Sequence, residues 1–308
     1  MISILLATYN GEKYISQQLD SIINQSVSEF KIFICDDCSS DRTIDIIKGY
    51  LEIYPEKIYL EVNKDNSGSA SSNFMKLMKK HKDDYIMLCD QDDIWLPDKI
   101  EKSLKKIKHM EIKYGVNMPL LVHTDLCVVD NDLKILDKSY IHRVNANYSK
   151  NAFNNEIIQN TLTGNTAIYN MALANLITNE PKYMVMHDWW LILIASAFGK
   201  VDYIEEATIL YRQHKDNIVG STNMRSFLYM LKRFCNKKDV VKAIDETYLQ
   251  AESFLEVYED TLSDELVKFL YEYIEIPKLS KLKRLNRIIK LNTFKNGFLR
   301  NIAYILFI

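Results

Sequence analysis

The chain has 308 residues, of which 47% are hydrophobic and 26% charged, a balance typical of a soluble globular protein with one large or two modest domains. Its five prolines and eight glycines are too few for long disordered or linker-like segments. The net charge of −2 hides a basic segment at residues 278–308 and an acidic remainder, which indicate an anionic surface as a partner.

The first half of the chain alternates predicted strands and helices. Apolar runs predict four strands, at residues 2–7, 30–35, 57–62 and 85–89. Helices are expected between them, where apolar side chains recur at helical spacing after polar turns. Strands separated by helices of this length imply right-handed crossovers and a mostly parallel sheet.

Polar side chains follow three of these strands at the point where each strand ends. They are Thr8, Tyr9 and Asn10 after the first strand, Asp36 and Asp37 after the second, and Asp90, Asp92 and Asp93 after the fourth. Because ligands bind at the carboxyl ends of strands in open α/β sheets, we expect these side chains to line one crevice.

The stretch "DQDD" places three carboxylates within four residues. Such groups repel one another, and partial burial raises their pKa values, so a positive partner is expected. The alternative is an acidic loop that caps the next helix, and for an isolated stretch of this kind that alternative is favoured.

Cys35 and Cys38 form a C-x-x-C pair, but no second pair or neighbouring histidine completes a zinc site. Free thiols in a reducing cytosol are therefore expected, and the lack of a basic leader at residues 1–11 agrees with a cytoplasmic location.

Residues 119–213 predict further strands and a helix that begins near "HDWW". The longest apolar run, residues 189–199, is about half the length needed to span a bilayer, so no membrane crossing is expected. From about residue 226 the pattern is helical, with an aliphatic and a basic face near the C-terminus. These helices predict an anchor on a membrane surface, and the alternative is a hairpin that packs on the body or on a second subunit of a homodimer. No nucleic-acid partner is expected, because the basic stretch has no recognisable binding module.

Three motifs in order resemble the family 2 glycosyltransferases: "ILLATYNGEKYISQQLDSIINQ", "FKIFICDDCSSDRT" and "DQDDIWLPDKI". The resemblance runs from residue 2 to about 220 and implies an inverting, nucleotide-sugar-dependent enzyme. It also implies an α/β, GT-A-type (Rossmann-like) fold with a mostly parallel sheet flanked by helices. We expect a domain at residues 1–220, with a nucleotide-sugar half (about 1–115) and an acceptor half (about 116–220). A helical, basic and amphipathic region should follow at residues 221–308.

The resemblance implies that the acidic cluster holds a divalent cation, Mg²⁺ or Mn²⁺, which also contacts the diphosphate of the donor. The candidate metal residues are Asp90, Asp92, Asp93 and His214, and the sequence leaves open whether Asp92 or Asp93 ligates directly. The ion would stabilise the leaving nucleoside diphosphate. By the same analogy His214 and Arg212 approach the metal or the diphosphate. For His214 the alternative is an ordinary surface histidine with satisfied hydrogen bonds.

The nucleotide sugar is expected to contact Thr8, Tyr9, Asn10 and Asp37, with Asp37 accepting the base N3–H and Asp36 supporting the loop. Asp92 is expected near the ribose or the metal. Ordinary turn and capping chemistry is the alternative for these residues, and it would be preferred without the resemblance.

Asp188 in "MHDWW" matches the position of the catalytic base, which removes the proton of the acceptor hydroxyl. An N-capping aspartate is the alternative. The acceptor side is expected to include His187, Trp189, Trp190, Thr163, Gly164 and Asn165.

Within the family, "MHDWW" and "YRQHKDNIVG" are similar to bacterial rhamnosyltransferases that use dTDP-L-rhamnose to build cell-wall, capsular or O-antigen polysaccharides. The expected reaction therefore moves L-rhamnose onto a saccharide acceptor, commonly lipid-linked, at the cytoplasmic face of the plasma membrane. Three alternatives are a UDP-hexose donor, a non-catalytic saccharide-binding protein and a sugar-nucleotide pyrophosphorylase. A pyrophosphorylase would need a glycine-rich, basic phosphate-binding loop after the first strand, and "TYNGEKY" is not such a loop.

Overall fold

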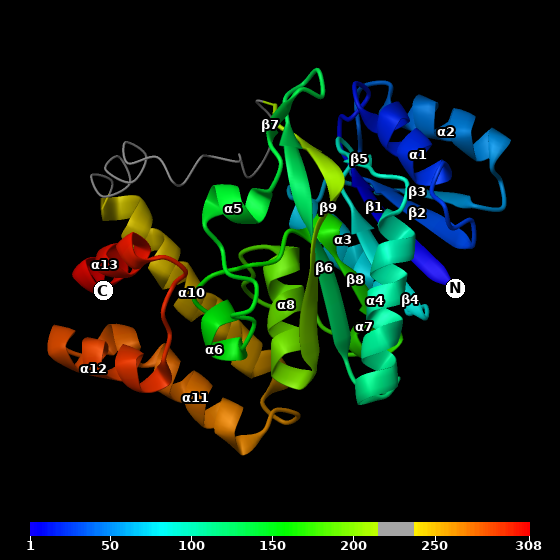
Figure 1. The fold of residues 1–308 in the computed structure, drawn as a ribbon. Coiled ribbons are helices and arrows are strands. Elements are labelled where there is room, and N and C mark those ends of the chain that lie inside the picture. The colour runs from blue at the N-terminus through cyan, green and yellow to red at the C-terminus, as the bar shows by residue number, and fades with distance from the viewer. Residues whose placement is uncertain (215–236) are drawn as a thin grey trace. The chain divides into compact units, whose positions relative to one another are not determined.

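A computed structural model describes residues 1–214 and 237–308, which form parts of two compact units (Figure 1). The first unit comprises Met1–Tyr140, Leu162–Thr178 and Gly199–Ser221. The second comprises Ile141–Thr161, Asn179–Phe198 and Thr222–Ile308. The predicted boundary between residues 220 and 221, the end of the "YRQHKDNIVG" motif and the predicted helix start near residue 226 lie outside the described residues.

One mixed sheet runs through the first unit, with the strand order β3-β2-β1-β4-β8-β6-β9-β5 and with β7 paired to β6. Its strands are β1 (Ile2–Thr8), β2 (Phe30–Asp36), β3 (Ile58–Val62), β4 (Tyr85–Cys89), β5 (Ile94–Trp95), β6 (Leu120–Val129), β7 (Ile135–Asp137), β8 (Ile168–Asn170) and β9 (Lys200–Arg212). The four strands of the first half are parallel, as predicted, and so are β6 and β9. The short strands β5, β7 and β8 are antiparallel to their neighbours.

Helices connect and flank the strands of the first unit. They are α1 (Ile15–Ile23), α2 (Thr43–Ile53), α3 (Ala70–Lys80), α4 (Lys99–Tyr114) and α7 (Met171–Ala174), with a short 3₁₀ turn η1 (Gly164–Thr166). In α1, Ile15, Leu19 and Ile22 recur at helical spacing and are all buried, so the apolar face of the helix packs on the sheet as its sequence predicts.

The parallel register brings the predicted polar residues to one edge of the sheet. Thr8 is paired with Asp36 across β1 and β2, and Leu6 is paired with Cys89 across β1 and β4. All three strands therefore end at the same edge, and the loops that carry the candidate site begin there.

The described part of the second unit is helical. Its helices are α5 (Tyr140–Val144), α6 (Phe153–Glu156), α8 (His187–Phe198), α10 (Lys237–Tyr258), α11 (Asp264–Ile274), η2 (Ile276–Lys278), α12 (Lys281–Leu291) and α13 (Phe298–Phe307). Helix α8 is apolar on nearly every side and is mostly buried. Trp190 packs on Phe254 and Tyr258 of α10, at ring-centroid distances of 5.3 and 6.1 Å. An apolar core helix of this kind is stabilised by the burial of its whole circumference.

Helix α12 is amphipathic, but most of its basic side chains are already engaged. Arg284 Nε donates to the Leu279 carbonyl at 2.8 Å, and Lys290 Nζ contacts Glu272 at 2.8 Å. Leu282 and Ile289 are 79% and 56% exposed, whereas Ile288 is buried. The aliphatic face of α12 is thus only partly covered. Within the described residues, no helix combines the length and apolar character required to cross a bilayer.

Candidate functional site

The loop after β1 is fixed by hydrogen bonds to the loop after β2. Thr8 is buried, and its hydroxyl donates to Asp36 Oδ2 at 2.7 Å. Asn10 has a φ of 46°, a conformation that asparagine tolerates better than most residues, and its Oδ1 accepts the Ser40 N–H at 2.8 Å. Tyr9 between them is 50% exposed. Of the three, Tyr9 is therefore the side chain most available to a ligand.

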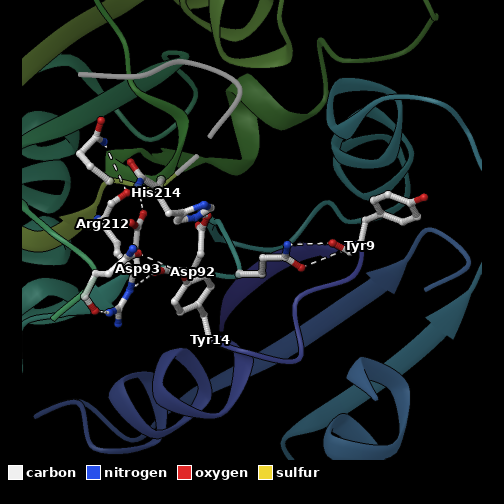
Figure 2. A network of polar contacts seen from close by, with 10 residues as sticks. Tyr9, Tyr14, Asp92, Asp93, Arg212 and His214 are labelled. Atoms are coloured by element: carbon white, nitrogen blue, oxygen red, sulfur yellow. Dashed lines mark hydrogen bonds and ion pairs between the residues drawn. The ribbon is translucent and has the colours of Figure 1, made fainter. Parts of the chain in front are cut away.

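Gln91 joins this loop to the acidic cluster. Its Nε2 donates to the Tyr9 carbonyl and its Oε1 accepts the Tyr9 N–H, both at 2.9 Å, so one amide satisfies both backbone groups of Tyr9 (Figure 2). A Cβ at Gly11 would lie 2.3 Å from Gln91 Oε1, so a larger residue there would displace the Gln91 amide from its bonds to Tyr9. The sequence did not reveal this contact. Gly11 also suits an ordinary turn, and Gln91 lies 82 positions away from Tyr9 in the chain.

The two acids at the end of β2, Asp36 and Asp37, are both buried and hydrogen-bonded. Asp36 accepts the Ser39 N–H and hydroxyl at 2.8 and 2.6 Å. On Asp37, Oδ1 accepts Asn63 Nδ2 and the Ser67 N–H, each at 2.8 Å, and Oδ2 accepts the Ser67 hydroxyl at 2.8 Å. Each carboxylate oxygen can accept about two hydrogen bonds, so Asp37 Oδ2 has capacity for a further donor.

An open hollow of about 460 Å³ lies beside Asn63 and Ser67, the two residues that hold Asp37. It is lined by Glu61, Val62, Asn63, Lys64, Asp65, Ser67, Ser72, Asn73 and Lys76. Cys35 and Cys38 both donate to Asn63, at 3.4 and 3.1 Å, and burial raises the pKa of Cys35 to about 11. A thiol with a raised pKa is a poor metal ligand or nucleophile, in agreement with the prediction of free thiols.

Asp93 is the buried member of the acidic cluster. Its Oδ1 accepts the Arg212 N–H at 3.0 Å, and its Oδ2 accepts Asn165 Nδ2. Burial raises the pKa of Asp93 well above its usual value, and repulsion from Asp92 and Asp90 raises it further. The expected electrostatic conflict between packed carboxylates is thus evident at Asp93. Asn165, which we predicted on the acceptor side, lies against this loop, in the turn η1 that also holds Gly164.

Arg212 supports the acidic loop from within the protein. It is almost completely buried, and its Nε donates to the Asp92 carbonyl at 2.9 Å. Its Nη1 and Nη2 donate at 2.6 Å each, to the Asn131 carbonyl and to Gln17 Oε1. These contacts tie the end of β9 to α1 and to the turn after β6. The geometry therefore favours a supporting role over direct contact with a diphosphate.

A buried lysine underlies the same loop. Lys99 opens α4, is fully buried, and has its Nζ 4.7 Å from the centre of the Trp95 ring. Burial lowers the pKa of Lys99 to about 7, although Cys89 and Asp93 act in the opposite direction. The helix-start motif "PDKI" gave no sign of this, because a lysine in a first turn is normally solvated.

Asp92 and His214 face each other. Asp92 Oδ2 and His214 Nε2 are 2.7 Å apart, and the two side chains are 18% and 8% exposed (Figure 2). Nowhere in residues 1–214 and 237–308 are three or more His, Cys, Asp or Glu side chains gathered as a metal site. A magnesium-type ion commonly takes one or two protein ligands and completes its shell with substrate phosphates and water. Asp92 and His214 fit such an open site, but not a closed one.

The second unit holds Asp188 in the first turn of α8. Its Oδ1 accepts the Trp189 N–H at 2.6 Å and Asn160 Nδ2 at 3.1 Å. Burial lowers the pKa of His187 to about 3, so His187 is neutral and fits a packing role. Trp190 is fully buried, and Trp189 Nε1 donates to the Glu156 carbonyl at 2.6 Å. Asn160 is a residue that the sequence analysis missed, since a lone asparagine in a loop carries no signal.

Glu156 closes the loop that carries Asn160. Thr161 donates its hydroxyl and its N–H to the two carboxyl oxygens of Glu156, at 2.6 and 3.1 Å. Burial raises the pKa of Glu156 to about 8 from an ordinary value of 4.5, and the bonds from Thr161 only partly offset this. The loop between residues 156 and 161 is therefore clamped at both ends by a carboxyl group that stays protonated at neutral pH.

We expect this protonated Glu156 to make stability depend on pH. Between about pH 4.5 and pH 8 the folded state keeps a proton that the unfolded state has lost, so stability falls as the pH rises through this window. Relative to Glu156→Gln, wild type should lose about 1.4 kcal/mol per pH unit there. Urea unfolding of both proteins between pH 5 and pH 8.5 measures the difference, and parallel pH profiles would show that Glu156 is ionised in the folded state.

Comparison with known proteins identifies the family. The family described as Glycosyl transferase family 2 matches residues 3–165, which is more than half of the chain. The dTDP-rhamnosyl transferase RfbG of Shigella flexneri is 31% identical over 229 residues, covering 70% of this chain and 74% of that protein.

Solved structures show the same fold at low sequence identity. S. aureus TarS 1–349 in complex with UDP-GlcNAc has a TM-score of 0.54 and 17% identity, covering 99% of this chain and 90% of that one. The mannosyltransferase PcManGT from Pyrobaculum calidifontis, in complex with GDP-Man and Mn²⁺, has a TM-score of 0.53 and 13% identity, covering 94% and 85%. These likenesses and the family match confirm the predicted GT-A fold, and the chain belongs to glycosyl transferase family 2.

Proposed function

We propose that this glycosyltransferase is a metal-dependent, inverting enzyme that transfers L-rhamnose from dTDP-L-rhamnose to a saccharide acceptor of a bacterial surface polysaccharide. The choice of sugar is supported by the similarity to RfbG, which extends over 70% of the chain. Family membership removes the pyrophosphorylase alternative. A UDP-hexose donor and a non-catalytic binding protein are the alternatives that experiment has to separate.

The observation that carries the donor site is the convergence of three loops at one sheet edge. Tyr9 offers an exposed ring to the base, and Asp37 retains hydrogen-bonding capacity for its N3–H. Thr8, Asn10 and Asp36 are taken up by contacts between loops, so we assign them to shaping the site.

Asp92 and His214 are the residues that would hold Mg²⁺ or Mn²⁺. Asp92 is favoured over Asp93, because Asp93 is fully buried and bonded through both oxygens to Arg212 and Asn165, whereas Asp92 is partly exposed. When bound, the ion supplies Lewis-acid stabilisation of the leaving nucleoside diphosphate. The role of Asp93, with Arg212 behind it, is to keep Asp92 at the edge of the sheet.

Asp188 is our candidate for the general base. In this role its carboxylate accepts the proton of the acceptor hydroxyl, while the acceptor oxygen bonds to the anomeric carbon and the bond to the diphosphate breaks on the opposite face. Its place in the first turn of α8 and the bond from Asn160 support the proposal, because they fix the carboxylate in one orientation.

A lipid-linked acceptor at the cytoplasmic face of the membrane would suit the C-terminal helices. Leu282 and Ile289 of α12 and Phe298 of α13 are exposed apolar side chains beside exposed lysines such as Lys283. Sedimentation with vesicles that contain anionic lipid tests this surface: loss of binding in a Leu282→Ser/Phe298→Ser variant would support it, and absence of wild-type binding would contradict it.

The donor is tested by thermal shift with dTDP-L-rhamnose, UDP-glucose, UDP-GlcNAc and GDP-mannose, each with and without Mn²⁺. A ligand at a hundredfold excess over its Kd stabilises the folded protein by about 2.7 kcal/mol. We expect dTDP-L-rhamnose to give the largest shift, and only with Mn²⁺. A larger shift with a UDP-sugar would replace rhamnose by that sugar, and a full shift without Mn²⁺ would refute metal dependence.

A further inference from the structure

The ring of Tyr14 lies at the centre of the contacts around Asp92. Tyr14 immediately precedes α1 and is largely buried. Its ring stacks on the His214 imidazole, with centroids 4.9 Å apart and planes 25° from parallel. The Arg212 guanidinium lies 4.8 Å from the centroid of the same ring. One aromatic side chain therefore contacts both residues that reach the acidic loop from the end of β9 (Figure 2).

The hydroxyl of Tyr14 fixes the ring in this place. It donates to Asn131 Oδ1 at 3.0 Å, and the Asn131 carbonyl accepts Arg212 Nη1 at 2.6 Å. One turn further along α1, Gln17 Oε1 accepts Arg212 Nη2 at 2.6 Å. Because the ring is held at its hydroxyl and by the start of α1, it is a rigid surface for the groups that pack on it.

The geometry of His214 depends on this surface. Its ring meets Asp92 through Nε2, and the orientation of a ligating imidazole is usually set by what holds the rest of its ring. Two contacts of His214 come from Tyr14, directly before α1, and from Asp92 in the acidic loop. The Tyr14 ring lies against the face of the imidazole.

We propose that Tyr14 is a positioning residue for cation binding, whose ring holds His214 in register with Asp92 and links the nucleotide loop after β1 to the metal loop after β4. The proposal rests on the proposed role of Asp92 and His214 as ligands. Binding of the ion would then depend on an aromatic ring at position 14, although that ring offers the ion no ligand of its own.

The test uses the full chain with Mn²⁺ and dTDP, and compares Tyr14→Leu, Tyr14→Phe and Tyr59→Leu. Isothermal calorimetry gives the Mn²⁺ affinity, pulsed electron paramagnetic resonance reports coupling of bound Mn²⁺ to an imidazole nitrogen, and melting without ligands reports stability. Tyr59 is a matched control, because it also stacks on an aromatic ring, that of Phe33 at 5.1 Å, in the same unit.

We expect Tyr14→Leu to weaken Mn²⁺ binding by about 10–100-fold, the usual effect of removing a group that orients a ligand, and to lose the nitrogen coupling. Tyr14→Phe keeps the ring and should stay within about threefold of wild type, as should Tyr59→Leu. If Tyr14→Leu fails to fold, Tyr14→Met, which keeps an apolar side chain without a ring, takes its place with the same expectation.

Two results would overturn the inference while leaving the metal site intact. One is unchanged Mn²⁺ affinity and nitrogen coupling in the ring-deleted variant, whatever its melting temperature. The other is an equal loss in Tyr14→Phe, which would assign the effect to the hydroxyl. Absence of Mn²⁺ binding by wild type with dTDP, UDP and GDP would instead refute the proposed metal site, and the inference with it.

Discussion

Replacing Asp188 with asparagine is expected to lower the rate of sugar transfer by about 10²–10⁴-fold, the usual contribution of a general base. The amide keeps the size of the side chain and an oxygen that can still accept from Asn160 and the Trp189 N–H, but it cannot take up the acceptor proton. Donor affinity, measured by calorimetry with dTDP-L-rhamnose and Mn²⁺, should therefore stay at the wild-type value.

The control for this variant is Asp264→Asn. Asp264 lies in the first turn of α11, as Asp188 does in α8, so the same charge is removed from the same place on a helix of the same unit. Transfer is measured as release of nucleoside diphosphate in the presence of acceptor. Wild-type turnover in Asp188→Asn would move the base to another residue, and donor binding without turnover in the wild type would favour a non-catalytic protein.

Asp92→Asn is expected to abolish the metal dependence of donor binding. An amide is a weaker ligand than a carboxylate for a hard divalent cation, and it removes the charge that faces His214. The loss of Mn²⁺-dependent affinity should exceed the roughly 10–100-fold effect of losing an outer-shell partner. Calorimetric titration of dTDP at several Mn²⁺ concentrations, with a chelator as the metal-free reference, measures this dependence.

Asp98→Asn is the matched control, because Asp98 lies only six positions further along the chain, between β5 and α4, and pairs with Lys102 at 2.8 Å. It should bind dTDP and Mn²⁺ like the wild type. If donor binding by Asp92→Asn depended on Mn²⁺ as in the wild type, the ion would have to bind elsewhere. An equal loss of affinity in Asp98→Asn would show that the effect comes from the change in net charge alone.

The sequence predicts the parallel half of the fold well, because its signals are local. The strands that end at Thr8, Asp36 and Cys89 are mostly apolar, and the helices between them fix their direction. The order of β8, β6, β9 and β5 was beyond such reasoning. Strands as short as Ile94–Trp95 carry no periodicity, and their neighbours are distant in the chain.

The candidate site shows the same limit at the level of side chains. Acidic residues at strand ends were visible, but which of them is exposed depends on partners more than 70 positions away, such as Asn165 and Arg212 for Asp93. Gln91 and Tyr14 likewise meet partners more than 70 positions away, and Asn160 meets Asp188 28 positions away, so the local sequence does not reveal the role of any of the three. Distance along the chain hides such pairs from any single-sequence pattern.

The amide bridge between Gln91 and Tyr9 has a consequence for engineering donor preference. Gln91 bonds to both backbone groups of Tyr9 and fills the space beside Gly11. The conformations of residues 8–11 and 90–93 therefore depend on each other. A chimaera that imports either segment alone from a homologue would lose the fit between Gln91 and the backbone of Tyr9. Loop grafts in this enzyme should therefore exchange the two segments together.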